Sequence, residues 1–143
     1  MPAPENLVLR FPDQGCFGCS PSNPIGLHLT FERRGDAVEA AVTIAEHFHG
    51  APSVAHGGIV ATLLDEISCA AVAFLRDQWV VTGELSVRYE RPVPVAHPLT
   101  LTARIVEEAH SRYAVVHGVV SCDDTPLARS TGKFFYQGPN GAS

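Results

Sequence analysis

The sequence predicts a single α+β domain, in which one long buried helix is wrapped by an antiparallel sheet of about five to six strands. Residues 59–75 contain no Gly or Pro and are rich in Ala and Leu, which favours a helix. On both sides of this segment, apolar and polar residues alternate with the period of half-buried strands. Short connections between the later segments favour antiparallel pairing.

Length and composition narrow the class of protein. The chain has 143 residues, enough for one compact domain, and its 45% hydrophobic content can fill a core. A net charge of −5 without a basic stripe argues against a nucleic-acid partner. The longest apolar stretch, residues 67–75, is about half of a membrane span. The first residues have neither the basic nor the apolar region of a secretion signal, so we expect a cytoplasmic protein with no membrane partner.

The chain divides into three segments. Residues 1–26 are rich in Pro, Gly, Asn and Ser and predict an N-terminal arm or loop. Residues 27–137 form the domain, and residues 138–143 form a polar tail. Alternation and length predict six strands, with the helix between the second and the third. These strands cover residues 27–32, 38–44, 79–92, 99–105, 113–122 and 127–136.

Burial of the apolar residues points to an oligomer. The helix is apolar around nearly all of its circumference, which predicts burial on most sides. Val115, Val116, Val119 and Val120 share one strand and cannot all point inward, because side chains alternate along a strand. We expect a second subunit to cover some of them.

Two acidic residues, Asp65 and Glu66, fall in the middle of the helix. Charged groups are rarely buried without a partner or a task. Burial raises the pKa of a carboxyl group, and a raised pKa suits a general base. The alternative is that at least one of the two side chains points to solvent where the sheet leaves the helix uncovered.

The start of the helix carries a second candidate group, His56-Gly57-Gly58. Glycines let a ligand approach the backbone closely, and the first N–H groups of a helix have no intrahelical partner. Together with the helix dipole they could stabilise an oxyanion on a carbonyl group. The alternative is a turn whose glycines only set the direction of entry into the helix.

The spacing of these two groups has a geometric consequence. Gly57 and Asp65 are eight residues apart, which is roughly 12 Å along a helix. A carbonyl held by the N–H of Gly57 or Gly58 is therefore out of reach of Asp65 in the same chain. Two antiparallel helices in a two-fold dimer would bring each helix start beside the middle of the other, which predicts two equivalent sites at a dimer interface.

Three segments carry a family resemblance. His56-Gly57-Gly58, followed by Ala61-Thr62-Leu63-Leu64-Asp65-Glu66, resembles the signature of the hotdog-fold acyl-CoA thioesterases of the phenylacetate-pathway (PaaI-like) branch. Upstream, Cys16-Phe17-Gly18-Cys19 and Asn23-Pro24-Ile25-Gly26-Leu27 resemble a leader common in that group. Downstream, residues 89–94 (Tyr-Glu-Arg-Pro-Val-Pro) resemble the segment that closes the strand after the helix. The resemblance covers roughly residues 16–136.

The resemblance implies a hotdog fold, assembled into homodimers and often homotetramers. It also implies hydrolysis of an acyl-CoA thioester without a metal or cofactor. Asp65 matches the carboxylate that activates water or attacks the acyl carbon. Gly57, with Gly58 next to it, matches the glycine whose N–H binds the thioester oxygen, and His56 helps to shape that site.

Two further positions come from the same resemblance. His49 stands where the family often has Gln or Asn, which is a departure; it could orient the substrate, or this subgroup could position water differently. Thr82 stands where some members place Ser or Thr near the carboxylate.

The remaining polar candidates have plainer alternatives. Arg88, Arg91, Arg129 and Lys133 could bind the phosphates of coenzyme A, or they could form a solvated strand face. Cys16 and Cys19 could be a metal or redox pair, but a zinc site needs two more ligands and the sequence has no second C-x-x-C. We therefore expect no metal and interpret the pair as part of a loop packed near the site.

Two other functions compete with thioester hydrolysis. A non-catalytic acyl-CoA-binding module would keep the helix start but would need no carboxylate, and Asp65 argues against it. A hotdog hydratase or dehydratase would need a His and a carboxylate converging on the acyl chain, whereas His56 is tied to the glycine turn.

Overall fold

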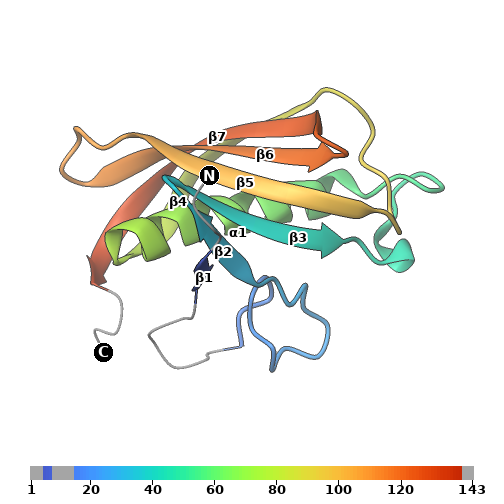
Figure 1. Ribbon diagram of the computed structural model, residues 1–143, viewed down its shortest axis with the longest axis horizontal. Coiled ribbons are helices and arrows are strands. Elements are labelled where there is room, and N and C mark those ends of the chain that lie inside the picture. Colours follow the sequence, from blue (N-terminus) through green and yellow to red (C-terminus); the bar gives the residue numbers. More distant parts are fainter. Residues whose placement is uncertain (1–4, 8–14, 140–143) are drawn as a thin grey trace.

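The computed structural model describes residues 5–7 and 15–139 and shows one long helix against one antiparallel sheet (Figure 1). The sheet has seven strands in the order β1-β2-β3-β5-β6-β7-β4, and every neighbouring pair is antiparallel. The strands and helices are β1 (Glu5–Leu7), β2 (Phe31–Arg34), β3 (Ala37–Thr43), the 3₁₀-helix η1 (Glu46–Phe48), α1 (Gly57–Arg76), β4 (Gln78–Tyr89), β5 (Pro98–Glu107), β6 (Tyr113–Cys122) and β7 (Thr125–Pro139).

Helix α1 lies across the inner face of the curved sheet (Figure 1). One face of α1 is fully buried and packs against inward side chains of the strands. Asp77, in the left-handed conformation with φ of 51°, ends the helix and lets β4 return along it. The largest fully buried side chains are Phe134, Ile44, Leu63, Leu64, Ile67 and Leu101. The helix is thus at the centre of the core, as the sequence predicts, but the sheet buries only one face of it and not most of its circumference.

By length and composition alone, α1 could also cross a membrane. Its 20 residues include a window with a mean hydropathy of 1.8, of which 44% is buried. The stretch 67–75 is free of charged residues and is only about half of a membrane span, whereas this longer window tolerates charged residues of α1. The apolar side chains of α1 pack against the sheet, so the fold itself accounts for its composition.

The first strand differs from the expectation. The alternation of residues 27–32 predicts a strand there, but β2 begins only at Phe31. The Leu27 N–H donates to the Phe17 carbonyl (2.8 Å) and the Leu29 N–H to the Gly18 carbonyl (2.9 Å). This extended segment therefore bonds to the preceding loop rather than to the sheet, and alternation alone cannot distinguish the two partners.

The ends of the chain contain more strand than the sequence predicts. Three residues of the expected arm form β1 and pair with β2. At the other end β7 runs to Pro139, into the expected tail. The rest of the arm's first 14 residues and residues 140–143 lie outside the described residues. The boundaries of the arm, the domain and the tail stay predictions.

The valines of β6 alternate as expected. Val116 and Val120 are fully buried, whereas Val115 and Val119 are half-buried on the outer face. Strand β4 is one edge of the sheet, and its outer edge has no strand neighbour among the described residues. Trp79, Val81 and Tyr89 are large exposed apolar residues on this edge strand. The sheet thus leaves a long, apolar edge open for pairing.

Candidate active site

The helix start offers one backbone donor, not two. His56 is the N-cap of α1, and its Nδ1 accepts a hydrogen bond from the Gly58 N–H (2.9 Å). The Gly57 N–H has no hydrogen-bond partner within the described part of the chain. The expected pair of donors is therefore reduced to Gly57, because the side chain of His56 satisfies Gly58.

Tyr89 holds the same turn from the other side. Its hydroxyl group donates to the Gly57 carbonyl oxygen at 2.6 Å. This contact links the C-terminal end of β4 to the start of α1. The Gly57 carbonyl is thus held by Tyr89, and Gly57 itself is exposed, which suits an N–H donor to an incoming carbonyl oxygen.

A second group of polar side chains lies in the middle of α1. The Thr82 hydroxyl, on β4, donates to Asp65 Oδ1 at 2.6 Å. Cys69 Sγ lies 3.6 Å from the same Thr82 oxygen. Because the only hydroxyl proton of Thr82 goes to Asp65, the Cys69 thiol is the donor in the second contact. Burial raises the pKa of Cys69 to about 12, so this thiol keeps its proton.

An irregularity in β4 aims Thr82 at the helix. The pairing of β4 with β7 shifts between Thr82 and Glu84. In a regular strand, Thr82 and Tyr89 would point to opposite faces, because they are an odd number of residues apart. The bulge at Gly83 turns both toward α1. A Cβ atom on Gly83 would lie 2.3 Å from a ring carbon of Phe135, so any larger residue there would have to displace that ring.

An apolar cavity of about 200 Å³ opens beside this group. Cys69 lines the cavity, and Thr82 connects Cys69 to Asp65 through two contacts, so the cavity lies close to Asp65. Its other lining residues are Cys16, Cys19, Phe31, Glu66, Ala70, Ala73, Phe74, Trp79 and Val80. Such a lining suits an apolar group of a ligand.

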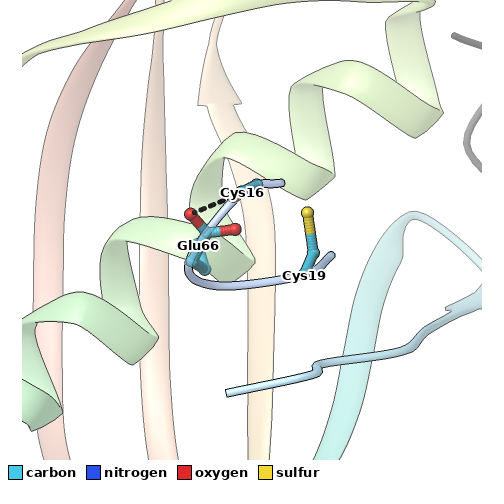
Figure 2. Close-up of side chains that lie close together, drawn as sticks. All are labelled: Cys16, Cys19 and Glu66. Atoms are coloured by element: carbon cyan, nitrogen blue, oxygen red, sulfur yellow. Dashed lines mark hydrogen bonds between the residues drawn. The ribbon is translucent and has the colours of Figure 1, made fainter. Parts of the chain in front are cut away.

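Glu66 lies at the rim of this cavity, beneath the loop of Cys16 and Cys19 (Figure 2). Cys16 Sγ is 3.6 Å from Glu66 Oε1. The pKa of Glu66 is raised, chiefly by burial. The hydrogen bond from Cys16 lowers this pKa, and the negative charge of Asp65 raises it. Glu66 is thus half-buried and does not belong to the Asp65–Thr82 pair.

The structure brings the sequence candidates together in two separate places. Asp65 and Thr82 form one group. His56, Gly58 and the exposed His49 line one groove at the helix start, together with Thr62. No hydrogen bond joins the two groups within the described residues, and their separation along α1 remains that of eight helical positions. One chain alone does not assemble the complete candidate site.

The candidate cations are dispersed. Lys133 forms an ion pair with Glu84 at 3.7 Å, and Arg129 forms one with Glu90 at 2.8 Å. Arg88 and Arg91 are exposed and form no ion pair within the described part of the chain. Arg91 and Tyr89 line one groove, which places this cation on the side of the helix start.

Sequence reasoning missed three contributors. Sequence patterns assign Tyr89 only to the segment 89–94 that carries the family resemblance, and they assign no role to Cys69. The contact of Glu66 with Cys16 spans 50 positions, and no local pattern encodes it. The C-x-x-C motif was the one available signal for a special environment at that end of the chain.

Comparison with known proteins shows the family and the fold of this chain. A family model described as the thioesterase superfamily matches residues 53–128, more than half of the chain. The crystal structure of a thioesterase superfamily protein is similar, with a TM-score of 0.78 and 29% identity. That match covers 85% of this chain and 60% of the other, so the chain spans about three fifths of the length of that relative.

Two further solved structures share the fold at lower identity. One is a hypothetical thioesterase protein from Streptococcus pneumoniae TIGR4 with coenzyme A, with a TM-score of 0.71, 22% identity, and coverage of 79% of this chain and 91% of that one. The other is a phenylacetic acid degradation-related protein from Ralstonia eutropha JMP134, with a TM-score of 0.67, 20% identity, and coverage of 76% and 85%. The architecture and the family match lead to the same conclusion: the chain has the hotdog fold and belongs to the thioesterase superfamily.

Proposed function

We propose that this protein hydrolyses an acyl-CoA thioester to a carboxylic acid and coenzyme A. The observation that carries the proposal is the Asp65–Thr82 hydrogen bond beside an apolar cavity, at the centre of a thioesterase-superfamily fold. A carboxylate oriented by a hydroxyl group, next to a pocket for an apolar chain, is what hydrolysis of a fatty or aromatic acyl thioester requires.

The chemistry needs a base and an oxyanion donor. Asp65 takes a proton from water, and the water oxygen bonds to the acyl carbon. The carbonyl oxygen of the thioester gains negative charge and accepts a hydrogen bond from the N–H of Gly57. The C–S bond then breaks, and the sulfur leaves as a thiolate that is protonated to give coenzyme A. Thr82 binds Asp65 Oδ1 and leaves Oδ2 to accept the proton.

We propose that the two groups meet across a homodimer. Strand β4 is an open edge with exposed apolar residues, so two copies can pair these edges antiparallel. A two-fold axis between Leu85 and Ser86 would place Tyr89 of one copy opposite the partner's Thr82. Since Tyr89 binds Gly57 and Thr82 binds Asp65, each helix start would then approach the carboxylate of the other copy.

Assembly and substrate class follow from the same proposal. The half-buried valines on the outer face of β6 favour further pairing of dimers into a homotetramer. The coenzyme A in the pneumococcal structure supports coenzyme A as the carrier. Arg91, beside the helix start, is the cation best placed for its phosphates. The phenylacetic acid degradation-related protein from Ralstonia supports the phenylacetate-type branch and an aromatic acyl group. We also propose that the protein is cytoplasmic.

The first test is hydrolysis of aromatic, short-chain and medium-chain acyl-CoAs, measured as release of free thiol. The proposal predicts turnover of at least one class. Binding of acyl-CoA without turnover of any class would contradict it and support a non-catalytic binding module. Addition of water across an enoyl-CoA without thiol release would instead support a hydratase.

A further inference from the structure

We propose that Cys16, Cys19 and Glu66 form a binding site for a thiophilic divalent cation, of which Zn²⁺ fits best. The site joins the loop that begins the described domain to the middle of helix α1 (Figure 2). The proposal does not depend on thioester hydrolysis, because none of the three residues belongs to the Asp65–Thr82 pair.

The ligand atoms already have a suitable spacing. One sulfur or oxygen atom from each residue lies within 4.8 Å of the others. Two ligands of a tetrahedral zinc, with Zn–S of about 2.3 Å and Zn–O of about 2.1 Å, lie about 3.6 Å apart. The measured distance from Cys16 Sγ to Glu66 Oε1 is 3.6 Å. A cation could therefore enter with small side-chain rotations.

The electrostatics of the site favour a cation. Glu66 is half-buried beside the loop, and the next residue before it on α1 is a second carboxylate, Asp65. No basic side chain forms an ion pair with Glu66 within residues 15–139. A divalent ion would supply the missing positive charge, and it would displace the protons of the carboxyl group and of the two thiols as it binds.

The loop is held in place by its own backbone. The Ser20 N–H donates to the Cys16 carbonyl (3.0 Å), and the Leu27 and Leu29 N–H groups bind the carbonyls of Phe17 and Gly18. Gly18 lies directly on Glu66, because a Cβ atom there would be 2.1 Å from Glu66 Cδ. The two cysteines thus flank the carboxylate from a turn that packs onto the helix.

The coordination would leave one position open. Cys16, Cys19 and Glu66 all line the apolar cavity, so a fourth ligand could be water or a polar group of a molecule inside it. Bound metal would also fasten the loop to α1. We therefore expect the metal to raise the unfolding temperature, whether or not substrate is present.

The test uses the full-length protein, reduced and freed of metal with EDTA, then titrated with Co²⁺ and competed with Zn²⁺. We expect thiolate-to-cobalt charge-transfer absorption at one ion per chain, loss of that absorption on addition of Zn²⁺, and a higher unfolding temperature with Zn²⁺. Cys16→Ser and Cys19→Ser should each remove the absorption, and Glu66→Gln, which keeps the shape of the side chain, should weaken binding. Cys122→Ser is the matched control, since Cys122 contacts Pro98 O on another part of the sheet and should leave binding unchanged.

Three results would overturn the proposal. The first is the absence of charge-transfer absorption in the reduced wild-type protein. The second is equal binding by the wild type and both cysteine variants with unchanged circular dichroism. The third is a Cys16–Cys19 disulfide that forms in air while the reduced protein binds less than half an ion per chain, which would make the pair a redox couple instead.

Discussion

The hydroxyl group of Thr82 donates a hydrogen bond to Asp65 Oδ1 at 2.6 Å, from a strand that bulges at the next residue. The bond fixes the orientation of the carboxylate that we propose as the general base. Thr82→Val should lower kcat about tenfold with little change in KM, because one hydrogen bond to the carboxylate is lost. Thr82→Ser keeps the hydroxyl group and should retain most of the activity. Equal rates for the two variants would show that the bond has no role in turnover.

The N–H of Gly57 can be removed without removing the helix start. Proline is favoured at the first position of a helix, and His56, with φ of −58° and ψ of 134°, has the backbone conformation that a following proline needs. Gly57→Pro should lower kcat about 10²- to 10³-fold through loss of the oxyanion donor. Gly57→Ala, whose Cβ would meet Tyr89 Oη at an ordinary 3.5 Å, keeps the N–H and is the control.

Variants of Gly57 and Asp65 also test whether each active site is built from both subunits of the dimer. Gly57→Pro and Asp65→Asn should each be nearly inactive alone. After unfolding and refolding of an equal mixture, half of the dimers are mixed, and each mixed dimer holds one intact site. The expected activity is therefore about a quarter of that of the wild type. An inactive mixture, with mixed dimers verified by mass spectrometry, would place both groups in sites within one chain.

Cys69 should be chemically inert in the native protein. Its thiol donates to Thr82, and burial raises its pKa to about 12, so almost no thiolate exists at pH 8. In EDTA, iodoacetamide should label the exposed Cys16 much faster than Cys69. Peptide mapping by mass spectrometry measures both rates in one sample. Similar rates would contradict the burial and the hydrogen bond assigned to Cys69.

The C-terminal end of α1 is tied to the β5–β6 connection by an ion pair that should make stability depend on pH. Arg76 Nη2 donates to Glu108 Oε2 at 2.9 Å, and this hydrogen bond lowers the pKa of Glu108 below 4.5. The unfolded chain therefore binds the proton more tightly than the folded chain does. The stabilisation is present above pH 4.5 and is lost as the pH falls through the lower, folded pKa.

Substitution of Glu108 measures this contribution. Since both side chains are about 40% exposed, Glu108→Gln should lower the free energy of unfolding by at most about 1 kcal/mol at pH 7. The difference from the wild type should shrink as the pH is lowered below 4. Glu107→Gln, at the neighbouring exposed position, is the control and should have no such effect. A deficit for Glu108→Gln that grows toward acid pH would contradict the assigned direction.

Apolar periodicity and the uninterrupted Ala-rich segment predicted the helix, five of the strands and the wrapping of the helix by the sheet, because these patterns reflect the core directly. The hotdog fold itself was implied by the family resemblance. The position of Asp65 in the apolar helix marked it as a candidate, and the resemblance added Thr82, to which the structure joins it by a hydrogen bond. The sequence could not predict that His56 Nδ1 accepts a hydrogen bond from the Gly58 N–H, since a histidine before two glycines has several possible side-chain directions. The sequence also could not predict the contact of Glu66 with Cys16. Nor could it show that residues 27–30 bond to the preceding loop and not to the sheet. Those features depend on tertiary neighbours, which local patterns do not specify.

The central claim is that Asp65 performs chemistry on a bound acyl-CoA, and a single comparison tests it most directly. Wild type and Asp65→Asn are assayed on the best acyl-CoA of the panel for kcat, and both are titrated with coenzyme A for Kd. The account predicts a loss of kcat of about 10²- to 10⁴-fold in Asp65→Asn, with the Kd for coenzyme A changed less than about threefold. Undiminished turnover in a folded Asp65→Asn variant would contradict it.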